Sequence, residues 1–324
     1  MFSYRALFRQ AWEISWRHKY LWFFGLFASV MVGGGSWEYQ IMTQNFNQGL
    51  INGSYVRLES VLALGGMAQD LVLGFINLFS YDIWTILNVL SFLLVALTLL
   101  VFFVWLAVTS QAALIGSTKK LLETKKKENG LSIRGGLTAG HNHFWSVLAL
   151  NFFSRILISF ALFLIGLPLL FMVIKDNGIL AAIYTILFII FVPVAMSLSL
   201  LVKYAIAYEV LENKSLIAAW EHGWHLFIKH WLISVEAAVI LFLINFVASG
   251  ALVILLSLFL LPLIVLGMLF QAGWLVIAIV LLGIVIIIFF GSVMTTFQTA
   301  AWTNLFLRLK NEGGLAKLER VFRR

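Results

Sequence analysis

The sequence predicts an all-α protein with six transmembrane helices, and three observations lead to this fold class. The chain of 324 residues is 62% hydrophobic and only 11% charged, whereas soluble domains carry about 25% charged residues. The apolar residues form long blocks, since 232–270 holds a single charged residue and 273–307 holds none. A helix crosses the hydrocarbon core with about 20 apolar residues. Lysine and arginine gather between these blocks, as they do at a membrane surface.

The distribution of basic residues predicts the orientation of the spans. With both termini in the cytoplasm, Arg57 and Lys175 lie outside and Arg155 lies within a span, while the rest of the 22 Lys and Arg residues face inward. Such a bias is the positive-inside pattern. We expect the six spans near residues 20–34, 83–112, 145–173, 180–205, 232–260 and 274–303.

Two segments do not fit a simple series of spans and short loops. Apolar sequence continues through 250–273, and a further span there would carry the basic tail, 306–324, to the outside. We therefore expect a long fifth helix, a turn around Pro262 and a short re-entrant piece on the outer side. The outer loop 35–80 is too short and too apolar for an independent domain.

An internal repeat divides the single membrane domain into three helical hairpins, of about 1–117, 118–211 and 212–324. Residues 11–16 (Ala-Trp-Glu-Ile-Ser-Trp) match residues 219–224 (Ala-Trp-Glu-His-Gly-Trp). The middle unit fits less well, because Gly-Gly replaces the Trp-rich turn. Each hairpin enters and leaves on the same side, so the repeats are parallel.

The ends of the second and sixth spans carry the same pattern. Thr109 and Gln111 follow a Phe-Phe pair, and Thr296 and Gln298 follow another pair at identical spacing. These matches occur in the same order along the chain, which supports the repeat.

The segments before the first and fifth spans resemble amphipathic helices that lie in the membrane interface. In the first, Arg5, Arg9, Glu13 and Arg17 fall every fourth residue and form one polar stripe. Such helices turn their cations toward anionic lipid and their aromatic rings toward the bilayer. They serve as anchors for the following spans or, alternatively, recognise lipids or a partner. The expected anchors are Trp12, Trp16, Trp220 and Trp224.

These features carry a resemblance to a known family. Six spans, the Ala-Trp-Glu-x-x-Trp type of segment before a hairpin, and Phe144-Trp145 at the third span are similar to bacterial membrane proteins grouped with the membrane domain of glycerophosphodiester phosphodiesterases. The resemblance covers nearly the whole chain and implies a multi-pass protein of the bacterial plasma (inner) membrane. It carries over no hydrolase activity, because nothing in these residues corresponds to the catalytic domain that some members have.

Candidate catalytic parts are few. The aspartates Asp70, Asp82 and Asp176 fall outside in this topology, whereas all six histidines fall inside, which rules out most Ser-His-Asp arrangements. The chain has no cysteine. We expect neither enzyme activity nor a cofactor. His141, His143, His222 and His225 are weak candidates for a cytoplasmic metal site, and interfacial histidines without a metal are the more ordinary reading.

Arg155 is the most unusual residue of the predicted spans, because a charge near the midplane is costly and needs a partner. Glu236 is the acid that lies in an apolar run, so we expect an intramembrane Arg155–Glu236 pair, helped by Asn245 or Gln111. The pair acts as a structural clamp between hairpins or as part of a polar pathway.

Two classes of function remain. The first is a non-catalytic membrane module that organises lipids or protein partners through its basic inner face, with anionic lipids on the cytoplasmic side and a possible membrane-protein partner. The second is a transporter or channel for a small or amphipathic solute. The net charge of +8 is distributed as for a membrane surface, so we expect no nucleic acid. The sequence leaves the oligomeric state open.

Overall fold

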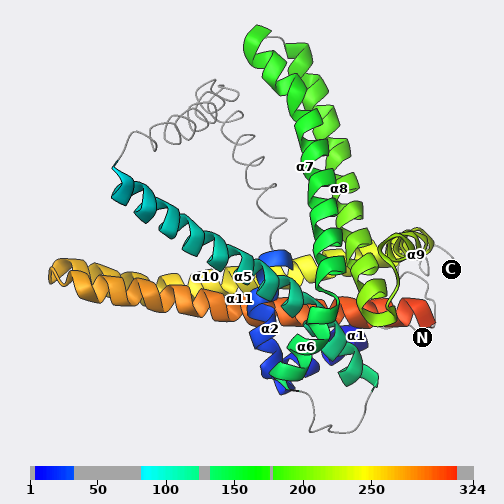
Figure 1. The fold of residues 1–324 in the computed structure, drawn as a ribbon, viewed down its shortest axis with the longest axis horizontal. Coiled ribbons are helices and arrows are strands. Elements are labelled where there is room, and N and C mark those ends of the chain that lie inside the picture. Colours follow the sequence, from blue (N-terminus) through cyan, green and yellow to red (C-terminus); the bar gives the residue numbers. More distant parts are fainter. Residues whose placement is uncertain (1–3, 33–81, 124–131, 176–177, 312–324) are drawn as a thin grey trace. The chain divides into compact units, whose positions relative to one another are not determined.

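The computed structural model describes residues 4–32, 82–123, 132–175 and 178–311. These parts of the chain are helical almost throughout and contain no strand (Figure 1). The predicted outer loop 35–80 and residues 312–324 of the basic tail lie outside the described residues.

Five of the described helices are long and apolar enough to cross a membrane. They are α5 (Ile83–Glu123), α7 (Phe144–Lys175), α8 (Gly178–Glu212), α10 (Trp231–Leu269) and α11 (Gly273–Asn311). The segment predicted as the first span is the apolar helix α2 (Tyr20–Val32), whose 13 residues reach about 20 Å against about 30 Å of hydrocarbon. The helical membrane class is therefore confirmed, and the six-span count stays a prediction.

Three short amphipathic helices precede α2, α7 and α10. They are α1 (Tyr4–Arg17), α6 (Ile133–Asn142) and α9 (Leu216–Lys229). A break separates each from the next helix, and a histidine lies at each break: His18, His143 and His230. Both segments predicted as amphipathic are helices, α1 and α9, and their position in the membrane interface stays a prediction. The middle unit has a short helix as well, although its sequence lacks the tryptophans.

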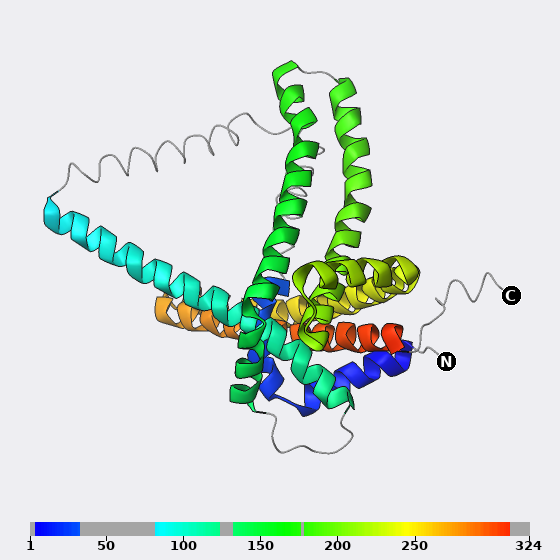
Figure 2. The same ribbon diagram turned by 45° about the vertical axis from the view of Figure 1, so that its right-hand side comes forward.

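The described helices belong to two compact units. The first unit contains 1–32, 107–151 and 200–324, and the second contains 33–106 and 152–199. In the second unit, α7 and α8 run side by side (Figures 1 and 2). The described apolar side chains of this unit are mostly exposed, which is the surface that a lipid environment requires.

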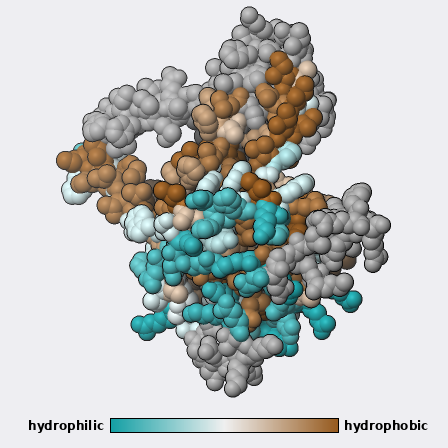
Figure 3. Space-filling model, turned by 90° about the vertical axis from the view of Figure 1, so that its right-hand side faces the viewer, coloured by the Kyte–Doolittle hydropathy of each residue, from teal (hydrophilic) through white to brown (hydrophobic). Residues whose placement is uncertain are grey.

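The first unit holds most of the buried core. Its buried side chains come from the last turns of α5 and α8, from α1 and from the second half of α11. Hydrophilic residues gather in one region of the surface, while the long helices are hydrophobic (Figure 3). Within this unit the chain is packed as a soluble protein is, and beyond the packed region its long helices present apolar surface.

The N-terminal helices pack on the C-terminal helix. The buried side of α1, formed by Leu7, Ala11 and Ile14, faces α11, and Asn304 Nδ2 donates to the Leu7 carbonyl at 3.3 Å. Helix α2 approaches α11 at Gly25, where a Cβ atom would collide with Thr296 and with the Ser292 backbone. The first and last segments of the chain are therefore neighbours.

The α10–α11 hairpin corrects one prediction. Helix α10 continues through Pro262 to Leu269, so there is no turn around Pro262 and no re-entrant piece. The turn lies at Phe270–Ala272, where the Gln271 N–H donates to Met268 O at 3.0 Å and the Ala272 N–H donates to Gly267 O at 2.9 Å. This is a Schellman-type C-cap with Gln271 in the left-handed region, at φ 52°. The sequence was misread because proline is tolerated inside transmembrane helices.

Candidate functional site

The predicted Arg155–Glu236 pair falls on both units. Arg155 lies on the part of α7 that belongs to the second unit, and Glu236 lies near the start of α10 in the first. Glu236 accepts a hydrogen bond from the Tyr4 hydroxyl of α1, a partner that the sequence did not indicate. The pair with Arg155 stays a prediction.

The four candidate histidines have separate surroundings. His143 Nδ1 lies 3.0 Å from Glu209 Oε1, and His222 Nε2 lies 3.3 Å from the Lys214 ammonium. His141 and His225 are exposed. Among the described residues, no three His, Asp or Glu side chains are grouped closely enough to hold a metal ion.

The expected tryptophan anchors flank the buried sides of α1 and α9. Trp12, Trp16 and Trp224 are 45%, 54% and 49% exposed, and Trp220 is partly buried. The rings of Trp12 and Trp16 stack with their centroids 5.7 Å apart. On the polar side of α1, Arg17 forms an ion pair with Glu13 one turn earlier, at 2.7 Å.

A cavity of about 370 Å³ lies in the polar region of the first unit, and we call it the α5–α6 cavity. It lies between the last turns of α5, the whole of α6 and the end of α8. Its size is within the range of small-molecule sites, roughly 300–1,000 Å³. The cavity is lined by Ala112, Ala113, Gly116, Ser117, Lys119, Lys120, Glu123, Ser132, Gly135, Gly136, Ala139, His143, Val210 and Leu211.

Small residues create this space. Helix α6 approaches α5 closely at Gly140, where a Cβ atom would lie 3.0 Å from the Ala113 nitrogen. Gly136, one turn earlier, accepts the ring of Phe24 from α2. The Gly-Gly sequence that interrupts the tryptophan repeat therefore has a local reason, since larger side chains at these positions would displace α2 and fill the cavity.

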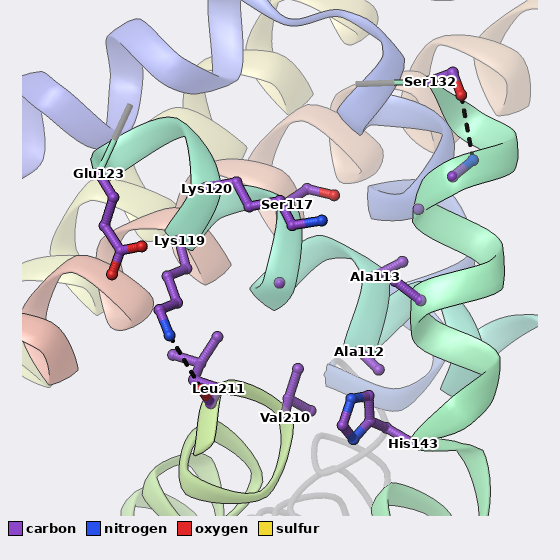
Figure 4. A pocket seen from close by; sticks show the side chains of 14 residues that line it. Ala112, Ala113, Ser117, Lys119, Lys120, Glu123, Ser132, His143, Val210 and Leu211 are labelled. Carbon is purple, nitrogen blue, oxygen red and sulfur yellow. Dashed lines mark hydrogen bonds between the residues drawn. The ribbon is translucent and has the colours of Figure 1, made fainter. Parts of the chain in front are cut away.

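Two lysines give the cavity its positive character. Lys119 Nζ donates to the Leu211 carbonyl in the last turn of α8, at 3.0 Å. A cation is stabilised there because the C-terminal end of a helix dipole is negative. Lys120 is exposed, and its side chain points from α5 toward α6 beside Ser117 (Figure 4). Glu123 is the one carboxylate among the lining residues.

The N-terminus of α6 opens on the same cavity. Ser132 is the N-cap, and its hydroxyl accepts a hydrogen bond from the Gly135 N–H at 3.2 Å. The first turn contains no acidic residue, so nothing there neutralises the partial positive charge of the helix end. Backbone N–H groups at such an end favour anions.

His143 and Glu209 fix one wall of the cavity. The Glu209 side chain is only 5% exposed, and its contact with His143 joins the α6–α7 break to α8. A buried carboxylate requires such a partner. The sequence showed His143 only as a metal candidate, because its partner lies 66 residues away.

A second, smaller cavity lies where α5, α8 and α11 meet, and we call it the Lys203 cavity. Its volume is about 50 Å³. It is lined by Gln111, Ile115, Lys203, Tyr204, Ile206, Ala207, Gln298, Thr299, Trp302 and Thr303. The repeated motif placed Gln111 and Gln298 at matching positions, and both lie here. Lys203 was counted in the sequence only as one of the inner basic residues.

Comparison with protein-family profiles, with curated proteins and with solved structures finds no match for this chain. The likeness to the membrane domain of glycerophosphodiester phosphodiesterases therefore stays a prediction from the sequence, and the geometry of the two cavities is the basis for a function.

Proposed function

We propose that this chain is a non-catalytic, multi-pass protein of the bacterial plasma membrane that binds the phosphate headgroups of anionic lipids in the α5–α6 cavity. The observation that carries the proposal is the juxtaposition of Lys119 and Lys120 with the uncompensated N-terminus of α6 around one cavity. Lysine ammonium groups and helix N-termini are both recurrent phosphate ligands.

The position of the cavity supports a lipid as the ligand. His143 lines the cavity and lies two residues before Trp145, which is 77% exposed. Exposed indoles concentrate at the membrane–water interface. The cavity then lies beside the headgroups of the inner leaflet, where anionic lipids give a negative surface potential.

The proposed topology places this leaflet on the cytoplasmic side. We propose six spans with both termini inside, arranged as three parallel hairpins that are each introduced by α1, α6 or α9. The repetition of a short amphipathic helix, a histidine break and an apolar helix supports this arrangement. It also agrees with the family resemblance and the strong excess of basic residues on one side.

The transporter alternative needs a water-filled cavity that reaches Arg155. Neither the α5–α6 cavity nor the Lys203 cavity is lined by Arg155 or Glu236. The lysines and the helix end at the α5–α6 cavity support the lipid-binding proposal instead.

Lipid binding by the purified protein tests the proposal. Native mass spectrometry in a neutral detergent measures occupancy as phosphatidylglycerol or phosphatidylcholine is added, with inorganic phosphate as a third arm. We expect phosphatidylglycerol to bind at least tenfold more tightly than phosphatidylcholine, and Lys120→Gln to weaken it about five- to tenfold, because a charge-assisted contact of about 1 kcal/mol is lost.

The matched control is Lys229→Gln, which removes an exposed cation from α9, away from the cavity lining. It leaves phosphatidylglycerol binding unchanged if the cavity is the site. Equal losses in the two variants would show that only general surface charge attracts the lipid. If inorganic phosphate binds saturably and the protein shows no preference between the two lipids, the ligand of the cavity is a free phosphate compound and the lipid proposal is wrong.

A further inference from the structure

Three helices build the Lys203 cavity, each with two lining residues four positions apart. α5, α8 and α11 each contribute a polar side chain and, one turn later, the residue four positions on: Gln111 with Ile115, Lys203 with Ala207, and Gln298 with Trp302. In the proposed topology these are the second helices of the three hairpins. The cavity therefore lies where all three hairpins meet, and one of these three polar residues is a cation.

Lys203 is a cation without an anionic partner among the described residues. It is only partly exposed and its ammonium group lies inside the protein. The Lys203 ammonium group makes a cation–π contact with the ring of Trp302, whose centroid lies 4.6 Å from Nζ. An ammonium group removed from water is costly unless a counter-charge and hydrogen bonds compensate it, and one cation–π contact supplies only part of this.

The surrounding side chains offer donors to an anion. The Gln111 carboxamide oxygen accepts a hydrogen bond from Asn151 Nδ2 at 2.9 Å, so its NH₂ group is the end left to donate. Gln298 and Thr299 add an amide and a hydroxyl from α11. None of the residues that line the cavity is acidic.

The volume limits the ligand to a small ion. The cavity holds about 50 Å³, whereas one water molecule occupies about 30 Å³ in the liquid. A monatomic anion with a water molecule fits this space, and a phospholipid headgroup does not. We propose that the Lys203 cavity binds a small inorganic anion such as chloride, with Lys203 as its counter-charge and the Gln111 and Gln298 amides as donors. This site is separate from the α5–α6 cavity and does not depend on the proposed lipid binding.

Thermal unfolding of the delipidated full chain in neutral detergent tests the site. Melting temperatures are measured at constant ionic strength and pH while sodium gluconate is replaced by sodium chloride or sodium bromide. A ligand that binds only the folded state raises the melting temperature in a saturable way. We expect a rise of about 3 °C when chloride exceeds its dissociation constant several-fold, because gluconate is too large for the cavity.

Two variants locate the effect. Lys203→Met removes the charge and keeps an unbranched apolar side chain, so it abolishes the chloride dependence, whereas Lys229→Met on α9 keeps it. Should Lys203→Met not fold, Gln298→Leu serves instead, and it shifts the half-saturating chloride concentration upward at least threefold. The control Gln10→Leu changes a partly exposed glutamine of α1 that is outside the cavity lining, and it causes no such shift. The proposal is overturned if wild type melts identically in gluconate and chloride, or if the chloride dependence persists unchanged in Lys203→Met or in Gln298→Leu.

Discussion

Gly140→Ala gives the sharpest test of the packed region, because α6 there rests directly on the backbone of α5. A Cβ atom at position 140 would lie under 3.0 Å from the Thr109 carbonyl oxygen, 3.0 Å from the Ala113 nitrogen and 3.2 Å from the Ala113 Cβ. Ordinary contacts lie at about 3.5 Å or more, so α6 must move away from α5 by at least about 0.5 Å. Overpacking of this kind costs about 1–3 kcal/mol.

The gain in helix propensity opposes this cost. The contact with the Thr109 backbone puts the overpacking cost at the upper end of its range, about 3 kcal/mol. Alanine is better than glycine in a helix by about 1 kcal/mol, so the net destabilisation of Gly140→Ala is about 2 kcal/mol. At roughly 2–4 °C per kcal/mol, the melting temperature falls by about 4–8 °C. The 12 tryptophans of the chain make intrinsic fluorescence a suitable readout in detergent.

Two further glycines have more space around them and allow the effect of crowding to be compared. At Gly223 the nearest atom to a Cβ is the Ala205 nitrogen at 3.0 Å, and at Gly250 nothing lies within 4 Å. We expect Gly223→Ala to be nearly neutral and Gly250→Ala to raise the melting temperature slightly. A Gly140→Ala protein as stable as the Gly250→Ala protein would refute the close approach of α6 to α5.

Three other changes follow from individual contacts. His143→Leu removes the histidine that contacts the buried Glu209 and destabilises the protein by about 3 kcal/mol. Adding Glu209→Gln to this variant recovers most of the lost stability in the same thermal assay. A double variant that is no more stable than His143→Leu contradicts the pairing. Gln271→Gly removes the cost of holding a side chain in left-handed backbone, so it stabilises the protein by about 1 kcal/mol and raises the melting temperature. A lower melting temperature contradicts the turn. Asn304→Leu frees α1 from α11 and speeds trypsin cleavage at Arg17 on immunoblots, whereas an unchanged rate means that other contacts suffice.

Composition and periodicity were enough to predict the helical membrane class. The apolar blocks became α5, α7, α8, α10 and α11, because blocks of this length have few other stable forms in a bilayer. The amphipathic pattern of residues 5–17 predicted α1, since its charges recur at helical spacing. Pro262 was a weaker signal, because a proline marks a helix end in soluble proteins and not in a membrane.

The cavities could not be predicted in the same way. Their walls combine residues from α5, α6, α8 and α11, and the contacts that shape them join distant positions, such as Lys119 with Leu211, 92 residues apart. Glycine and alanine at 112, 116 and 136 look unremarkable in sequence, since their role is to leave space. The matching positions of Gln111 and Gln298 are visible in the sequence, but there they indicate an internal repeat and not a cavity.

The packing of α1 and α2 against α11 has a consequence for the order of assembly in the cell. The bond between Asn304 and Leu7 joins residues 297 positions apart. At about 5–20 residues per second, a ribosome needs roughly 15–60 s between making one partner and making the other. During that interval the apolar side of α1 has no α11 to cover it, and the membrane interface or a chaperone must hold it. Biogenesis therefore ends with a closure step, in which the last helix made binds the first, and a chain that stops before α11 exposes an N-terminal surface that quality-control proteases can recognise.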